Sequence, residues 1–162
     1  MHSFTAAQST YSQVNPYDSL ELKLASANAD TQELRILKQL VDVAFGSDLQ
    51  KALAYARRGV QLSDKIGDKN RRPEFYEMEG RMHANLLQLD SATGFFNKAM
   101  QGYIAIDNKR GQVTTLFKIA WACKKKGEID KAMAADLQAS DLMETMGDQQ
   151  GIADACQHFL RF

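Results

Sequence analysis

The sequence predicts an all-α fold, an α-α superhelix in which antiparallel helix hairpins stack on one another. An apolar residue followed by turn residues recurs at a fixed interval of 40 residues, at Ile66, Ile106 and Met146. The 162 residues include only 2 prolines and 10 glycines, which favours helices over many short strands. Apolar residues within the 40-residue units follow the three- and four-residue spacing of one helix face.

The N-terminal stretch differs from the rest of the chain. Residues 1–17 contain no lysine, arginine, aspartate or glutamate and are rich in serine, threonine, glutamine and asparagine. This polar composition predicts a disordered segment. The segment lacks the basic start and the apolar run of a complete signal peptide, but the small residues in "SFTAAQ" resemble a cleavage region and make a leader-like segment the alternative. The stretch "PYDSLELKLASANAD" then predicts one extra helix over 18–28, capped by Asp18 or Ser19.

The remaining chain divides into repeats of two helices each. The repeats cover 33–72, 73–112 and 113–152, and a partial repeat covers 153–162. In the third repeat apolar residues stand at 113, 116, 117, 119, 120 and 123, and Gly127 ends that helix. The stretch "KIGDKN" connects the first two repeats. In it we expect Ile66 to be packed, Gly67 to form the turn and Asp68 to cap the next helix.

Small residues recur in fixed columns of the repeats. Two helices pack closely only where the side chain is small, and one hairpin cannot bury its apolar face without a neighbour. The predicted structural positions are Ala52, Ala92, Ala132, Gly80, Ala120, Ala99 and Ala139. Leu40 departs from this pattern, and Ala56 and Asp136 stand where Phe96 supplies a large apolar residue. The first repeat is therefore the most divergent, as an end repeat often is.

These features resemble the tetratricopeptide repeat (TPR) in its longer, 40-residue form. The stretches that carry the resemblance are "LQKALAYARRGVQLSDKIGD" (49–68), "KKKGEIDKAMAADLQAS" (124–140) and "MGDQQGIADA" (146–155). The resemblance covers about 33–162 and implies an interaction scaffold. The extra helix followed by "DTQELRILKQL" resembles the sensor or input regions of bacterial TPR-containing signalling proteins, such as histidine kinases and transcription regulators.

The resemblance also implies a binding surface, because the first helix of each hairpin lines the concave face of a TPR stack. The candidate partner-binding residues are Glu74, Glu77, Arg81, Asn85, Phe117, Trp121, Lys124 and Lys125. Trp121 is open to a second interpretation as plain core, and the run of lysines at 124–126 to one as a solvated helix end. The first repeat offers an apolar inner face, Leu34, Leu37, Val41, Ala44 and Phe45, into which we expect the extra helix to pack.

The sequence contains no catalytic constellation that we recognise. His2, His83 and His158 lack metal-ligand spacing, and we expect His83 to be packed. Cys123 and Cys156 are expected to be buried thiols, with a lone disulfide as the alternative. We therefore predict no metal, no cofactor and no enzymatic activity. An enzyme with an unrecognised site is the rival class.

Charge and hydropathy limit the partners. Lysine plus arginine equals aspartate plus glutamate, so the basic surplus typical of a nucleic-acid binder is missing. No run approaches the roughly 18 apolar residues of a membrane span. A protein or peptide ligand is the expected partner, with a homodimer through the apolar end "FLRF" as the alternative. That end also favours a chain cut from a longer protein. The compartment stays open: a sensor region favours the periplasm, a regulator the cytoplasm.

Overall fold

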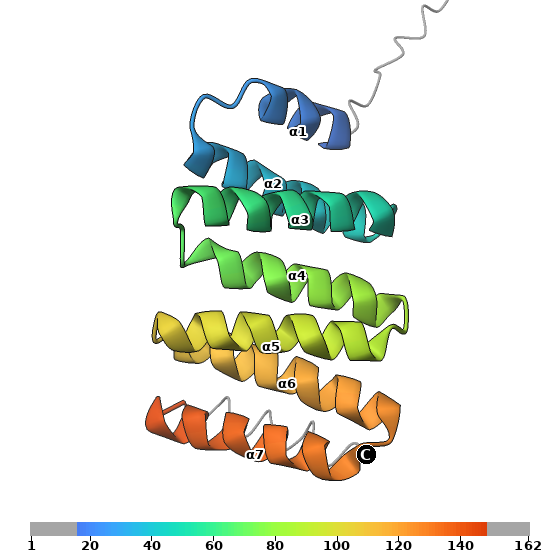
Figure 1. Ribbon diagram of the computed structural model, residues 1–162, viewed down its shortest axis with the longest axis vertical. Helices are drawn as coiled ribbons and strands as arrows, with labels where there is room; N and C mark the ends of the chain where they lie inside the picture. The colour runs from blue at the N-terminus through green and yellow to red at the C-terminus, as the bar shows by residue number, and fades with distance from the viewer. Residues whose placement is uncertain (1–15, 149–162) are drawn as a thin grey trace, which may run out of the picture.

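The computed structural model describes residues 16–148, and this range forms seven α-helices without a strand. They are α1 (Pro16–Ala25), α2 (Asp30–Phe45), α3 (Leu49–Ile66), α4 (Arg71–Asn85), α5 (Leu89–Ala105), α6 (Lys109–Lys126) and α7 (Ile129–Thr145). Each helix packs against the next, and Figure 1 shows them stacked in chain order from α1 at one end to α7 at the other. The predicted all-α superhelix of helix hairpins is confirmed.

The 40-residue period follows from the turns between hairpins. Gly67, Asp107 and Gly147 stand 40 residues apart, and their φ angles are +70°, +50° and +68°. This left-handed conformation ends one helix and redirects the chain into the next, and glycine adopts it without steric strain. Asp68 Oδ1 accepts hydrogen bonds from two backbone N–H groups of the following turn, each at 3.0 Å, so it caps α4 as expected.

The small columns lie where helices approach most closely. A Cβ atom built at Gly59 would come 2.3 Å from the ring of Phe75, and one at Gly80 would come 2.5 Å from the ring of Phe96. Neither ring can be approached so closely, so only glycine fits without a shift of the neighbouring helix. The alanines of the predicted columns are all buried: Ala52, Ala92, Ala99, Ala120, Ala132 and Ala139.

The apolar inner face of α2 packs with side chains of α1, α3 and α4. Leu37 and Val41 of α2 are fully buried in one cluster with Met78 and Met82 of α4. We expected the extra helix to pack into this inner face, and α1 packs against α2 and the same cluster, together with α3 and α4. From the end of the stack α1 adds Tyr17 and Leu24 to the edge of the same cluster, and the Tyr17 and Tyr55 hydroxyls lie 2.9 Å apart.

The N-terminal helix is shorter than the sequence predicted. The extra helix begins at Pro16 and ends at Ala25, where the sequence predicted 18–28. Ser26 Oγ donates a hydrogen bond to the Leu22 carbonyl at 3.1 Å, a local bond typical of a helix end. The predictions for residues 1–15, the partial repeat over 153–162, Cys156 and the apolar end lie outside the described residues.

Candidate binding site

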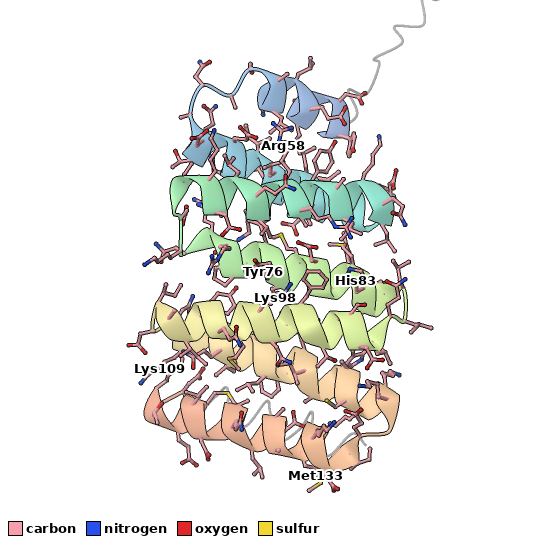
Figure 2. The ribbon with its side chains drawn as sticks, viewed as in Figure 1. Arg58, Tyr76, His83, Lys98, Lys109 and Met133 are labelled. Carbon is pink, nitrogen blue, oxygen red and sulfur yellow. The ribbon has the colours of Figure 1, made fainter. Side chains whose placement is uncertain are left out.

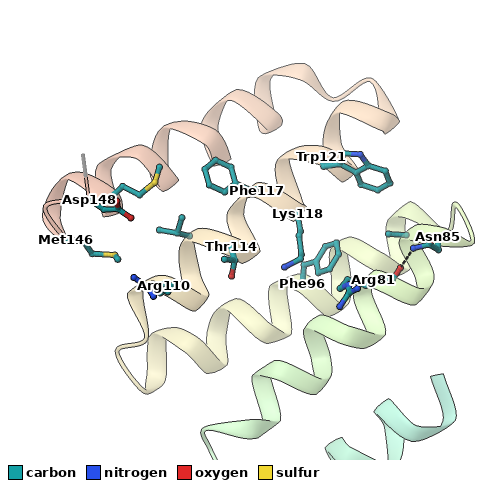
Figure 3. Close-up of a pocket in the computed structure, with 13 residues that line it drawn as sticks. Arg81, Asn85, Phe96, Arg110, Thr114, Phe117, Lys118, Trp121, Met146 and Asp148 are labelled. Atoms are coloured by element: carbon teal, nitrogen blue, oxygen red, sulfur yellow. Dashed lines mark hydrogen bonds between the residues drawn. The ribbon is translucent and has the colours of Figure 1, made fainter. Parts of the chain in front are cut away.

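A cavity of about 660 Å³ opens between α4, α6 and the end of α7. Figure 3 shows side chains from these helices converging on it, with Phe96 reaching in from α5. Among the residues that the structure describes, those that line it are Arg81, Ala84, Asn85, Phe96, Arg110, Val113, Thr114, Phe117, Lys118, Trp121, Met143, Met146 and Asp148.

The position of the cavity follows from a change of residue type in two columns. Leu37 and Val41 of α2 are apolar and fully buried against α4. Forty residues on, the same columns hold Glu77 and Arg81, which are only partly buried. Charged side chains keep their heads near water, so the contact between α4 and α6 stays open where the contact between α2 and α4 is closed.

Four of the eight predicted partner-binding residues line this cavity. Arg81 and Asn85 come from α4, and Phe117 and Trp121 come from α6 (Figure 3). The Asn85 side-chain amide donates to the Arg81 carbonyl at 3.3 Å. Trp121 is half-buried, and it both lines the cavity and packs against the cluster that contains Phe96. One part of the Trp121 ring is therefore packed as core, and another part faces the cavity.

Glu74 and Glu77 do not line the cavity but join neighbouring hairpins. Glu74 Oε2 accepts a hydrogen bond from Lys38 Nζ at 2.8 Å, linking α4 to α2. Glu77 Oε1 accepts from Lys118 Nζ at 2.6 Å, linking α4 to α6, and its Oε2 accepts from the Tyr103 hydroxyl at 3.2 Å. Burial and the nearby Glu77 carboxylate raise the pKa of Tyr103, which keeps its proton for this hydrogen bond.

Lys124 and Lys125 also lie outside the cavity lining. Lys124 Nζ is 3.2 Å from Asp136 Oδ2, an ion pair without hydrogen-bond alignment, and both side chains are largely buried between α6 and α7. Asp136 stands in the column of Phe96, so the lysine stem and the carboxylate fill space that an aromatic ring fills in the previous repeat. Lys125 is exposed and lies 5.9 Å from the Trp121 ring centroid. The third lysine of the run, Lys126, pairs with Asp90 at 2.6 Å.

Several lining residues were not predicted from the sequence. Arg110 lies one helical turn before Thr114 and Lys118 lies one turn after it, so extending the four-residue spacing along α6 would have found both. Met143 and Met146 come from the far end of α7. Their distance from α6 depends on how the two helices cross, which residue spacing does not define.

The cavity combines apolar walls with a positive rim. Arg110 is exposed, Lys118 is partly buried, and the Arg81 guanidinium lies 4.5 Å from the Phe45 ring centroid. Arg81 also lies 3.9 Å from the Asp42 carboxylate, a separation too long for a strong ion pair. Asp148 is the carboxylate among the described lining residues. Because Lys118 is paired with Glu77, the positive charge that a bound group meets at the opening comes from Arg81 and Arg110.

The described residues offer no metal centre. Over residues 16–148 no group of three or more His, Cys, Asp or Glu side chains could hold a metal ion, and the described cavity lining contains no histidine or cysteine. Cys123 is buried in the core of α6 and α7, and burial raises the pKa of its thiol. His83 stacks on Phe95 with 5.0 Å between ring centroids. Within the same range no helix is long and apolar enough to span a bilayer.

Solved structures with the same fold are known. Aspartyl phosphate phosphatase F from Bacillus subtilis superposes with a TM-score of 0.79 at 15% identity, over 86% of this chain and 37% of that protein. BtubC from P. vanneervenii gives 0.67 at 16% identity, over 85% of this chain and 63% of that one. A kinesin light chain of Podospora anserina with TPR-like repeats gives 0.63 at 12% identity, over 85% and 72%.

These comparisons show the fold: the chain is a TPR-like helical-repeat solenoid. It spans less than two thirds of the length of the first two proteins described above. At such low identity the likeness shows architecture alone. No model of a protein family matches the sequence, and no curated protein matches it either.

Proposed function

We propose that this chain is a non-enzymatic binding module that holds a peptide or protein segment in the cavity between α4, α6 and α7. The cavity itself carries the proposal. Its volume of about 660 Å³ falls in the range of ligand sites, which is about 300–1,000 Å³. The resemblance to TPR scaffolds supports the same conclusion, because those repeats present their first helices to a partner.

The lining indicates which segment fits. Phe96, Phe117 and Trp121 offer ring surface, and Met143 and Met146 offer flexible side chains that adapt to an irregular shape. Arg81 and Arg110 stand at the opening, where a guanidinium binds a carboxylate in two-point contact. The expected ligand therefore inserts a large apolar side chain and places an acidic group at the rim.

A role in a larger signalling protein is part of this proposal. The resemblance of the N-terminal part to bacterial sensor regions supports an input or interaction region of a larger signalling protein. Self-association through residues 153–162 also stays a prediction, because those residues lie outside the described range. Light scattering of the chain with and without that segment tests it: a monomer in both cases removes the dimer alternative.

The binding proposal can be tested without knowing the natural partner. A random peptide library displayed on phage is selected against the full chain, and the selected peptides are labelled with fluorescein. Their dissociation constants are then measured by anisotropy against single variants. We expect Arg110→Ala and Trp121→Ala to weaken binding by roughly 5- to 30-fold, about 1–2 kcal/mol.

Lys109→Ala is the matched control. Lys109 precedes Arg110 and carries the same charge but does not line the cavity. Figure 2 places it at the edge of the stack. We expect it to leave affinity unchanged. Selected peptides that bind Arg110→Ala and Trp121→Ala as tightly as the wild type would show that the cavity is not the binding site.

A further inference from the structure

Arg81 differs from the other cations of the cavity because its guanidinium contacts the preceding hairpin. Lys118 is bound to Glu77 at 2.6 Å, and Arg110 is exposed in the first turn of α6. Arg81 extends from α4 toward α2, where its guanidinium carbon lies 4.5 Å from the centroid of the Phe45 ring. Figure 3 shows Arg81 among the side chains of the cavity lining, so one side chain both contacts α2 and lines the cavity.

The Arg81 guanidinium also lies near a carboxylate of α2. Asp42 Oδ1 is 3.9 Å from Arg81 Nη1, beyond hydrogen-bond range, and the two side chains are 55% and 36% exposed. An ion pair this long and this exposed to water is weak. An acidic group of a ligand can therefore replace Asp42 as the partner of Arg81. A ligand that binds Lys118 must instead break the shorter bond to Glu77, whose side chain is only 17% exposed.

The Phe45 ring acts on Arg81 in the opposite sense to Asp42. A guanidinium over the face of an aromatic ring is attracted to it, and this attraction restricts the directions in which the long Arg81 side chain points. A side chain that is already ordered loses less conformational entropy when a ligand binds, so the ring favours binding. Phe45 is itself partly buried against the core cluster of the first hairpin, which holds the ring in place.

We propose that Phe45 and Asp42 of α2, neither of which belongs to the described cavity lining, control how strongly Arg81 binds the acidic group of the ligand. Phe45 is a positioning residue that strengthens this contact, and Asp42 is a competing carboxylate that weakens it. The site therefore selects a peptide with an aspartate or glutamate near its large apolar side chain, and the first hairpin sets the strength of that preference. This inference rests on the proposed function, because it concerns the ligand of the same cavity.

Two peptides test the inference on the full chain. One is the tightest-binding peptide selected from the phage library, and the other is its neutral analogue, in which asparagine or glutamine replaces each aspartate or glutamate. Both have an amidated C-terminus, are labelled with fluorescein and are titrated by anisotropy. The ratio of their dissociation constants measures the contribution of the acidic group. We expect the acidic peptide to bind the wild type about tenfold more tightly than its neutral analogue.

Variants of α2 should change this ratio in opposite directions. Phe45→Leu should reduce the preference for the acidic peptide to about threefold, and Phe45→Tyr, which keeps a ring, should retain it. Asp42→Asn should raise the preference about two- to threefold, and Arg81→Met should abolish it. Asp130→Asn is the matched control for the loss of one exposed negative charge, because Asp130 lies on α7 outside the described lining, and it should leave the ratio unchanged.

A measurement on the free protein tests the positioning of Arg81 separately. In isotope-labelled protein the Arg81 Nε–H signal is assigned by its absence in Arg81→Lys, and its heteronuclear NOE reports how ordered the side chain is. We expect the NOE to fall in Phe45→Leu and to keep its wild-type value in Phe45→Tyr. A merely structural effect of Phe45→Leu would instead weaken both peptides alike, leave their ratio unchanged and appear as a loss of helicity in circular dichroism.

An unchanged ratio in Phe45→Leu or in Asp42→Asn overturns the inference, as does a ratio that rises as much in Asp130→Asn as in Asp42→Asn. Selected peptides without an acidic residue overturn it too. Peptides that depend on Trp121 but show none of these ratio changes refute the inference and leave the proposed function intact. If no peptide is selected, the proposed function fails together with the ligand contact, and the NOE still decides whether Phe45 positions Arg81.

Discussion

Replacing Gly80 by alanine tests the close contact between α4 and α5. Alanine in a helix interior is favoured over glycine by about 1 kcal/mol, so the change alone would stabilise the protein. A close contact in the folded structure opposes this stabilisation. The new Cβ would lie 2.5 Å from two ring carbons of Phe96, so this ring, which is 1% exposed, would have to leave its packed position against α4.

Inserting a methyl group into a filled core destabilises by typically 1–3 kcal/mol. Set against the helix gain, Gly80→Ala should lower the free energy of unfolding by up to about 2 kcal/mol. Gly94→Ala is the control, because Gly94 lies inside α5 and a Cβ there meets nothing within 4 Å. It should raise the free energy of unfolding by roughly 0.5–1 kcal/mol.

Urea unfolding followed by circular dichroism measures both variants under one set of conditions. A double-mutant cycle adds Phe96→Leu, which removes ring atoms from the contact. Phe96→Leu should be less destabilising in the Gly80→Ala background than in the wild type. If Gly80→Ala stabilises the protein as much as Gly94→Ala does, the Phe96 ring moves at no cost and the contact between α4 and α5 is not tight.

Three further predictions concern the backbone and two buried charges. Leu87 has a φ of +56° and is 73% exposed, so Leu87→Gly should raise the free energy of unfolding in urea by about 1 kcal/mol, whereas Leu86→Gly, at φ −82°, should not. Lys124→Met leaves the Asp136 carboxylate buried without its ion-pair partner and should lower stability by about 3 kcal/mol in thermal melts; adding Asp136→Leu should restore most of it. Burial raises the pKa of Glu79 above its ordinary value of 4.5, so the folded state binds more protons than the unfolded state; the stability Glu79 contributes is present below about pH 4.5 and is lost as pH rises through the folded pKa. Glu79→Gln should therefore gain stability relative to the wild type as the pH rises above about 4.5, measured in urea titrations, and a constant difference would contradict this.

The candidate site shows where prediction by residue spacing ends. Arg81 and Trp121 occupy the same column of successive repeats, and the structure brings both to one cavity. Glu77 shares the neighbouring column with Phe117, yet it turns to Lys118 and joins two hairpins. The position in the repeat defines the helix face on which a side chain lies. The nearest opposite charge then determines the direction of its charged end.

The repeat architecture could be predicted from residue spacing alone. Turn residues such as Gly67 and Gly147, 40 residues apart, and the buried alanine column of Ala52, Ala92 and Ala132 are local and steric features, and each acts through its immediate neighbours. Such features can be read along the chain, because glycine in a left-handed turn and alanine at a close contact have few substitutes.

The position of the open cavity, by contrast, depends on how the hairpins stack. Leu37 and Val41 close the space between α2 and α4, whereas Arg81 and Trp121 leave a cavity between α4 and α6. Lys124 was predicted on the concave face and lies instead against Asp136. Long charged side chains can reach in several directions from one backbone position. Which one they take depends on the distance to groups on other helices, and that distance exists only once the hairpins have stacked.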